Sequence, residues 1–222
     1  MSYDFSFGPV FRNFDLLLEG AFLTIQLSAV TIALGLIIGS LGAVVKVWGP
    51  KPARIAITCY VDFIRNTPLL VQLFVVYFGL PTIGIGLSAS QAAIVGLTIY
   101  TGAYTVEIVR AGIQAIPKSQ IEAGLCLGLS YVQVFRYIII FPALKIVYPA
   151  LTSQFVLIML GSSLVSLISA KELFHAAAFL DSRTFLPFEI YLIVSLMYLA
   201  MSLGFRGLFF AIGRVAFSRG GN

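Results

Sequence analysis

Apolar stretches long enough to cross a membrane recur along this chain. A membrane-spanning helix needs roughly 20 mostly apolar residues, and the segments that reach this length are Leu16–Val45, Ile55–Gly79, Ser90–Gly112, Val134–Leu160 and Pro187–Phe210. Polar residues concentrate between them, and no linker rich in proline or serine divides the chain. The pattern predicts an all-α integral membrane protein, a bundle of about five transmembrane helices in one domain.

Composition leads to the same class of protein. Of the 222 residues, 59% are hydrophobic and only 10% are charged, whereas soluble proteins average about 45–50% apolar and about 25% charged residues. The net charge of +5 indicates basic cytoplasmic loops rather than nucleic-acid binding. Cys59 and Cys126 lie in different segments and form no Cys-x-x-Cys pair, so we interpret them as packing residues.

Basic residues give the predicted bundle a direction. They gather after the first and third segments and near the C-terminus, at Lys46, Lys51, Arg54, Arg110, Lys118, Arg136, Arg206, Arg214 and Arg219. The opposite side holds most of the acids, namely Asp4, Asp15, Glu19, Glu172, Asp181 and Glu189. Since positive residues favour the cytoplasmic side, we expect an extracytoplasmic N-terminal segment (1–15), a transmembrane domain (16–214) and a cytoplasmic tail (215–222).

The stretch between the third and fourth segments is too polar to span a membrane and too apolar for a plain loop. Ser119 and Glu122 have the spacing of a capping box, so we predict a short cytoplasmic helix over Gln120–Leu127, within a coupling segment of residues 116–130. Gly128 would end it, because glycine accepts the left-handed conformation. Its apolar residues would form an exposed docking surface: Ile121, Leu125 and Leu127.

This coupling segment resembles a known motif. Residues 122–124, followed by Gly128 and by an apolar run that ends at Pro142, resemble the EAA loop of ABC importer permeases. Two departures are visible. Gly124 stands where a second alanine is usual, and Pro142 comes one residue later than usual.

Two longer motifs make the resemblance more specific. Residues 63–74, with the sequence FIRNTPLLVQLF, and residues 104–117 resemble signatures of the polar amino-acid permeases. With the residues near the start, the similarity covers nearly the whole chain. The chain is therefore similar to a permease subunit of a binding-protein-dependent ABC importer for amino acids in a bacterial cytoplasmic (inner) membrane.

The resemblance implies a mechanism and partners. A separate ATPase subunit would bind ATP and Mg²⁺, since this chain has no G-x-x-x-x-G-K-[ST] loop and is expected to hold no cofactor itself. Its movement would rock the bundle and open the pathway alternately to each side. Other partners would be a second permease, identical or homologous, a substrate-binding protein and lipid. The residues implied to couple to the ATPase are Glu122, Ala123, Gly124, Leu125 and Gly128.

Charged residues within the predicted spans are functional candidates, because charge at membrane depth is costly. Asp62 and Arg65 lie three residues apart, on one face of a helix, and can pair. Pro68 can kink the helix after them. Glu107 and Arg110 repeat the same spacing. We interpret both as gating or structural ion pairs.

The fourth segment carries a polar run that we predict to line the substrate pathway, together with two residues of the second segment. These candidates are Gln154, Gly161, Ser162, Ser163, Arg65 and Thr67. The serines and Gly161 could equally be close-packing residues. Typical members of the family have a Lys-Asp pair where this chain has Leu160-Gly161. Its absence implies a neutral or acidic substrate, or a paired, non-identical permease that carries the binding residues.

Other classes of protein fit less well. A membrane enzyme needs paired carboxylates or a His/Asp/Glu cluster on adjacent spans, and a channel without an ATPase has no need of an EAA-like helix. The single histidine, His175, offers no metal-ligand spacing and is expected in a solvated outer loop. Gly35 and Gly39 indicate close helix packing rather than a dimer interface. We expect a non-catalytic transport subunit, with a channel or a membrane enzyme as the alternative.

Overall fold

The computed structural model describes residues 5–218, and every regular element within them is helical. The predicted positions Asp4 and Arg219 lie outside the described residues. Besides α-helices, the chain contains two π-helical turns, η1 and η3, and two 3₁₀ segments, η2 and η4. The elements are α1 (Gly8–Arg12), α2 (Phe14–Trp48), α3 (Lys51–Arg65), α4 (Leu69–Phe74), η1 (Val75–Gly79), η2 (Leu80–Ile83), α5 (Ala89–Gln114), α6 (Lys118–Cys126), α7 (Tyr131–Val134), η3 (Phe135–Ile139), α8 (Ile140–Gly161), η4 (Ser162–Ile168), α9 (Leu173–Thr184) and α10 (Pro187–Phe217).

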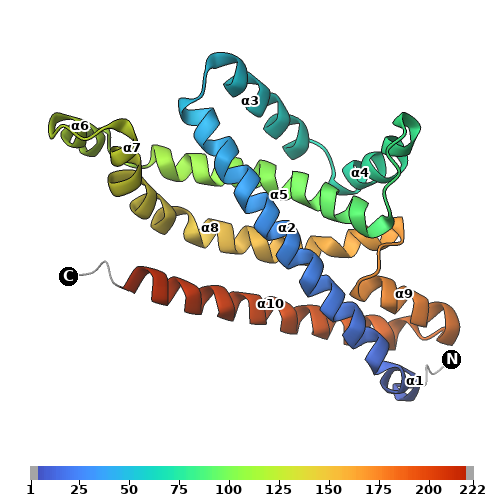
Figure 1. Cartoon of the computed structure of the whole chain (residues 1–222). Coiled ribbons are helices and arrows are strands. Elements are labelled where there is room, and N and C mark those ends of the chain that lie inside the picture. The colour runs from blue at the N-terminus through green and yellow to red at the C-terminus, as the bar shows by residue number, and fades with distance from the viewer. Residues whose placement is uncertain (1–4, 219–222) are drawn as a thin grey trace.

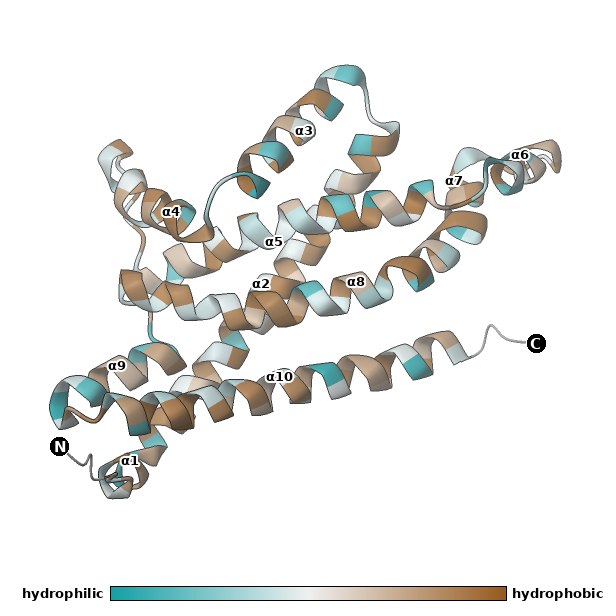
Figure 2. Ribbon diagram, turned by 180° about the vertical axis from the view of Figure 1, so that it is seen from behind, coloured by the Kyte–Doolittle hydropathy of each residue, from teal (hydrophilic) through white to brown (hydrophobic). Residues whose placement is uncertain are grey.

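The helices form an elongated bundle. α5, α8 and α10 run side by side, and α2 crosses them diagonally (Figure 1). α6 and α7 protrude at one end of the bundle, whereas α1 and α9 lie at the other. Apolar residues run along α2, α8 and α10, and α3 is more hydrophilic (Figure 2). The architecture matches the predicted all-α membrane bundle.

The number of spans agrees with the sequence. Within residues 5–218, four continuous stretches are long and apolar enough to cross a membrane, and a bent pair of helices would make five. The stretch Tyr131–Ile168 corresponds to the fourth predicted span and extends past its predicted ends, because α7, η3 and η4 continue α8. The stretch Pro187–Phe217, which corresponds to the fifth predicted span, is also longer than predicted. Arg206 and Arg214 both lie on this helix, which also includes the first residues of the predicted tail.

The predicted second span is not a continuous helix. Its two parts, Lys51–Arg65 and Leu69–Ile83, meet at 109°. Pro68 lacks an N–H to continue the helix, and its ring disfavours helical geometry at the residue before it. The prediction allowed for a kink, but the structure has a break.

Gln72 holds this break together from the inside. It is buried, and its Nε2 lies 2.8 Å from the carbonyl oxygen of Ile64, 3.0 Å from that of Thr67 and 2.8 Å from Thr67 Oγ1. Thr67 Oγ1 in turn donates to the carbonyl of Phe63 at 2.9 Å. Polar backbone groups freed by a broken membrane helix need such partners. Thr67, a predicted pathway residue, is thus used within the break.

Glycines of α2 allow it to lie directly against α5. A Cβ at Gly35 would lie 2.6 Å from the Thr101 side chain, and one at Gly39 would overlap Thr105. The small-x-x-x-small spacing therefore serves contact within the chain, as predicted, and is not left over for a partner.

Candidate functional site

The coupling segment folds as a short helix followed by a sharp turn. The helix is α6, and Pro117, not Ser119, occupies its N-cap position without a side-chain cap. The predicted capping box is therefore wrong at Ser119, because the helix begins before it; a capping box occurs instead at Ser130 and Gln133, where α7 begins. Proline suits this start, since it has no N–H to satisfy.

Gly128 ends the helix as predicted, with φ of 80°. The N–H of Gly128 donates to the carbonyl of Leu125 at 3.0 Å, and that of Leu129 donates to Gly124 at 3.1 Å. These two hydrogen bonds make a Schellman motif, in which the left-handed residue lets the chain fold back over the helix end.

The departures from the EAA pattern have a common structural setting. Gly124 is buried, and a Cβ there would overlap the side chain of Ile138, which belongs to the π-turn η3. A π-turn accommodates an extra residue relative to an α-helix. It lies between Gly128 and Pro142, where the spacing is one residue longer than usual, and Ile138 fills the space that an alanine at position 124 would need.

The predicted docking surface is only partly exposed. Ile121 and Leu125 pack against a buried cluster that includes Ile113, Ile116 and Val134, so their exposure was wrongly predicted. Leu127 is 83% exposed, and Tyr131 and Val132, which follow it in the chain, are 76% and 75% exposed. Glu122 and Ala123 are exposed too. The exposed surface formed by Glu122, Ala123, Leu127, Tyr131 and Val132 is called the coupling tip below.

Both cysteines are exposed, Cys126 on α6 and Cys59 on α3. Their exposure contradicts the interpretation of the two cysteines as packing residues.

A cluster of charged residues joins α2, α3 and α5 near the end of the bundle that carries the coupling tip. Glu107 on α5 accepts from Lys46 Nζ of α2 at 2.5 Å and from Arg110 Nη2 at 2.7 Å. Arg65, at the end of α3, lies 3.9 Å from the same carboxylate and 5.3 Å from the ring centre of Tyr104. The predicted pair of Glu107 and Arg110 is therefore present within a larger cluster.

The predicted pair of Asp62 and Arg65 does not form. Asp62 is exposed and makes no ion pair with any residue of 5–218. Arg65 instead turns to α5, where its guanidinium lies near the Glu107 carboxylate and over the ring of Tyr104. Spacing along one helix could not reveal a carboxylate on a neighbouring helix.

Two cavities of about 440 Å³ each lie between α8 and α10, and together we call them the α8–α10 groove. The cavity at the α9 end is lined by apolar side chains together with hydroxyl-bearing residues, including Ser163, Ser195, Tyr198 and Ser202. The other contains Thr152, Ser153 and Arg206. Neither cavity is lined by a carboxylate. The groove therefore has the size and polarity for a small polar solute without net positive charge.

Among the predicted pathway residues of the fourth span, Ser163 alone lines this groove. Ser162 is buried and donates to the carbonyl of Met159 at 2.7 Å, and Ser163 donates to Leu160 at 2.9 Å. Gln154 and Gly161 are half-buried elsewhere on the helix. These hydrogen bonds match the packing alternative for the serines.

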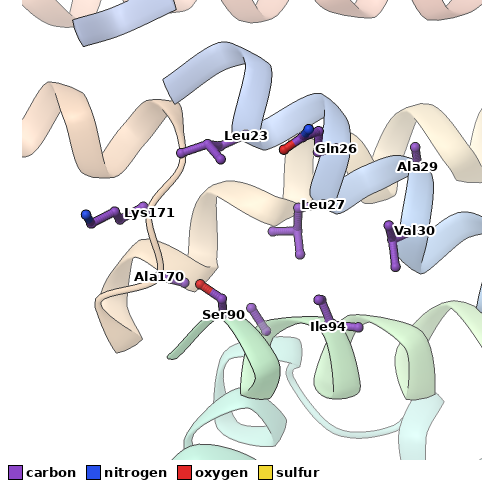
Figure 3. Close-up of a pocket in the computed structure, with 10 residues that line it drawn as sticks. Leu23, Gln26, Leu27, Ala29, Val30, Ser90, Ile94, Ala170 and Lys171 are labelled. Atoms are coloured by element: carbon purple, nitrogen blue, oxygen red, sulfur yellow. The ribbon is translucent and has the colours of Figure 1, made fainter. Parts of the chain in front are cut away.

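A third cavity of about 440 Å³ lies between α2, α5 and the chain before α9 (Figure 3). Leu27 and Ile94 face one another across it, and Gln26, Ser90 and Lys171 add polar groups at its lining. Apolar side chains dominate, so we assign it no chemistry.

The predicted outer loop holds a helix, α9, and two buried acids lie at its borders: Glu172 precedes α9, and Glu189 is in the first turn of α10. Glu172 is 1% exposed and Glu189 is fully buried, while His175 is half-buried. Burial raises the pKa of Glu172, and hydrogen bonds from Tyr198 and from the backbone N–H groups of Phe174 and His175 oppose this rise. One feature of the sequence could have indicated this role of Glu172: the acid stands directly before an apolar helical run.

Comparison with known proteins decides the family. The family described as "Binding-protein-dependent transport system inner membrane component" matches residues 21–215. The chain belongs to this family. The permease is therefore a non-catalytic, multi-pass subunit of an ABC importer in the inner membrane, and the family implies ATPase and substrate-binding-protein partners.

Individual relatives agree with this assignment. The permease is 39% identical over 194 residues to a probable glutamine ABC transporter permease protein, GlnM, of Bacillus subtilis (strain 168), covering 87% of this chain and 90% of the relative. It is 33% identical over 205 residues to the glutamine transport system permease protein GlnP of Escherichia coli (strain K12), covering 91% and 93%. The predicted membership of the amino-acid permeases is confirmed.

Solved structures show the same fold. The crystal structure of an amino acid ABC transporter with histidines contains a chain with a TM-score of 0.88 and 34% identity, covering 96% of the permease and 99% of that chain. The inward-facing MetNI methionine ABC transporter gives a TM-score of 0.79 at 19% identity, covering 92% and 98%, which supports the fold alone.

Across residues 5–218 of the permease, no group of three or more His, Cys, Asp or Glu could hold a metal ion.

Proposed function

We propose that this permease moves a neutral polar amino acid, such as glutamine, and that the coupling tip is where a separate ATPase docks. The coupling tip is the observation that carries the proposal. Leu127, Tyr131 and Val132 are apolar and at least 75% exposed, and they protrude at the end of the bundle (Figure 1). Exposed apolar side chains grouped in this way mark a protein contact.

The coupling residues divide into two kinds in this proposal. Glu122 and Ala123 would face the ATPase directly, since both are exposed. Gly124, Leu125 and Gly128 would act by shaping the segment, through close packing and the left-handed turn. ATP and Mg²⁺ would be bound by the ATPase.

The α8–α10 groove is proposed as part of the substrate pathway. Its hydroxyl groups and lack of a lining carboxylate suit glutamine better than the cation of arginine or lysine, because a buried cation needs a paired charge. Both relatives described above are named for glutamine. Gln154, Gly161 and Ser162 would shape the helix behind this wall rather than touch the substrate. Arg65 and Thr67 lie away from the groove, at α5 and in the α3–α4 break.

The same proposal fixes an orientation. The coupling tip would lie in the cytoplasm with the C-terminal end of α10, and α9 would lie outside with the N-terminus. The substrate-binding protein would dock at the α9 end. A second permease, identical or homologous, would complete the pathway, because five spans are too few to enclose one and also reach two ATPases. Residues 16–214 would form the transmembrane domain.

A thiol-protection experiment tests the docking site. In a Cys59→Ser background, the exposed Cys126 is labelled with a maleimide in the presence and absence of the ATPase. We expect the ATPase to protect Cys126. As a control, Ser218→Cys is introduced into a background that lacks both Cys59 and Cys126. This exposed position lies at the same end of the bundle, and its cysteine should remain labelled. Equal labelling of Cys126 with and without a stably bound ATPase would exclude the coupling tip as the contact.

A further inference from the structure

Three helices meet at Glu172, a buried acid that the proposed function does not use. Glu172 occupies the N-cap position of α9, and its Oε1 accepts the backbone N–H of His175 at 2.7 Å. Its Oε2 accepts the hydroxyl of Tyr198 on α10 at 2.7 Å. The carboxyl group thus accepts from the first turn of its own helix and from α10.

The third helix is α2. Thr24 Oγ1 accepts the N–H of Leu173 at 3.0 Å and donates to the carbonyl of Gly20 at 2.9 Å. A Cβ at Gly20 would lie 2.9 Å from Leu173 Cα, so the backbones of α2 and α9 are in direct contact. The first turn of α9 cannot move away from α2 without moving the Glu172 carboxyl.

Tyr198 connects this junction to the α8–α10 groove. Its side chain lines the cavity at the α9 end, beside Ser195 and Ser202 of the same helix and Ser163 across the groove. Phe174, two residues after Glu172, lines the same cavity. The first turn of α9 therefore contacts the groove both directly and through the hydrogen bond to Tyr198.

The length of Glu172 is more than helix capping requires. Ser, Thr, Asp and Asn are the preferred N-caps, and each would satisfy the first turn of α9. Burying a carboxyl group is costly unless it is fully hydrogen-bonded. The longer side chain at this position caps α9 and also reaches α10, which a shorter cap would not do.

We propose that Glu172 is a positioning residue for transport, which holds Tyr198 in the wall of the groove while α9 is docked on α2. The inference rests on the proposed function, since it takes the groove as the pathway and α9 as the end where the binding protein docks. A docked binding protein that displaces the first turn of α9 pulls the carboxyl away and releases Tyr198. The groove then changes shape at its α9 end.

The test uses the complex of permease and ATPase reconstituted in liposomes, with and without the loaded binding protein. Glu172→Gln keeps an oxygen for the cap but presents an NH₂ group to Tyr198, so the tyrosine hydroxyl loses its acceptor and can only accept in return. Tyr198→Phe removes the hydroxyl altogether. We expect each to raise ATP hydrolysis without binding protein by about threefold, as loss of one hydrogen bond predicts, and to lower stimulation by the binding protein. The double variant should equal Tyr198→Phe, because that variant already has no hydrogen bond between positions 172 and 198 for the second change to affect.

Glu189→Gln is the matched control. Glu189 is as buried as Glu172 and lies on α10, but it accepts the N–H of Ser6 at 2.9 Å and lies outside the groove lining. It should hydrolyse ATP as the unaltered complex does. Wild-type hydrolysis in both Glu172→Gln and Tyr198→Phe would overturn the inference, and so would additive effects in the double variant or the same effect in Glu189→Gln.

Two further outcomes are separable. If Glu172→Gln does not assemble, Tyr198→Phe decides alone, because it leaves the carboxyl and the cap of α9 in place. If the unaltered complex is not stimulated by any binding protein, the proposed function is contradicted and not the role of Glu172.

Discussion

Contact between α2 and α5 depends on single glycines. A Cβ at Gly39 would overlap the Thr105 side chain and lie 2.8 Å from the carbonyl oxygen of Gly102. Gly39→Ala should therefore destabilise the permease by about 1–3 kcal/mol, the usual cost of overpacking. Thermal unfolding in detergent measures this. Gly207→Ala on α10, where a Cβ meets nothing within 4 Å, should not destabilise the protein, and an equal loss in both variants would contradict this packing.

Gln72 is the second residue whose role is visible only in the fold. Gln72→Leu should lower stability by about 1–3 kcal/mol, because the polar groups at the α3–α4 break lose their buried partner. Gln26→Leu replaces an exposed glutamine that lines a mainly apolar cavity and serves as the control. Unfolding of the two variants is compared in the same detergent. A Gln72→Leu variant as stable as Gln26→Leu would mean that the break is held by Pro68 alone.

Among the elements, the coupling tip makes the sharpest prediction. Leu127→Asp places a charge in the middle of its apolar surface and should reduce ATPase association at least tenfold, while the exposed position leaves folding intact. Co-purification measures the association. Leu208→Asn on α10, which is also exposed and apolar but lies outside the coupling tip, should bind the ATPase normally. Normal binding by Leu127→Asp would place the ATPase elsewhere.

The elements also show where the sequence sufficed. The apolar runs predicted the spans because hydropathy alone decides them, and Gly128 was predicted to end a helix because few residues other than glycine tolerate its φ. Contacts between elements were not predictable in the same way. Arg65 prefers Glu107 on α5 to Asp62 on its own helix, and Glu172 is buried by helices from both ends of the chain. No spacing in one segment encodes such partners.

At the scale of the whole molecule, the bundle has two specialised ends. The coupling tip is exposed and apolar at one end, and α9 is tied to α2 and α10 at the other. The α8–α10 groove runs between them without a carboxylate in its lining. An energy source at one end and a binding protein at the other would act on the groove through rigid helices, which is the geometry that alternating access requires.

Uptake by the reconstituted importer tests this account most directly. Liposomes containing the permease, its ATPase and its binding protein are supplied with internal ATP and external radiolabelled glutamine, with unlabelled amino acids as competitors. The account predicts ATP-dependent accumulation of glutamine that excess arginine does not inhibit. Saturable, high-affinity uptake of arginine through a homodimer of this permease, or glutamine flux that continues without ATPase or ATP, would contradict it.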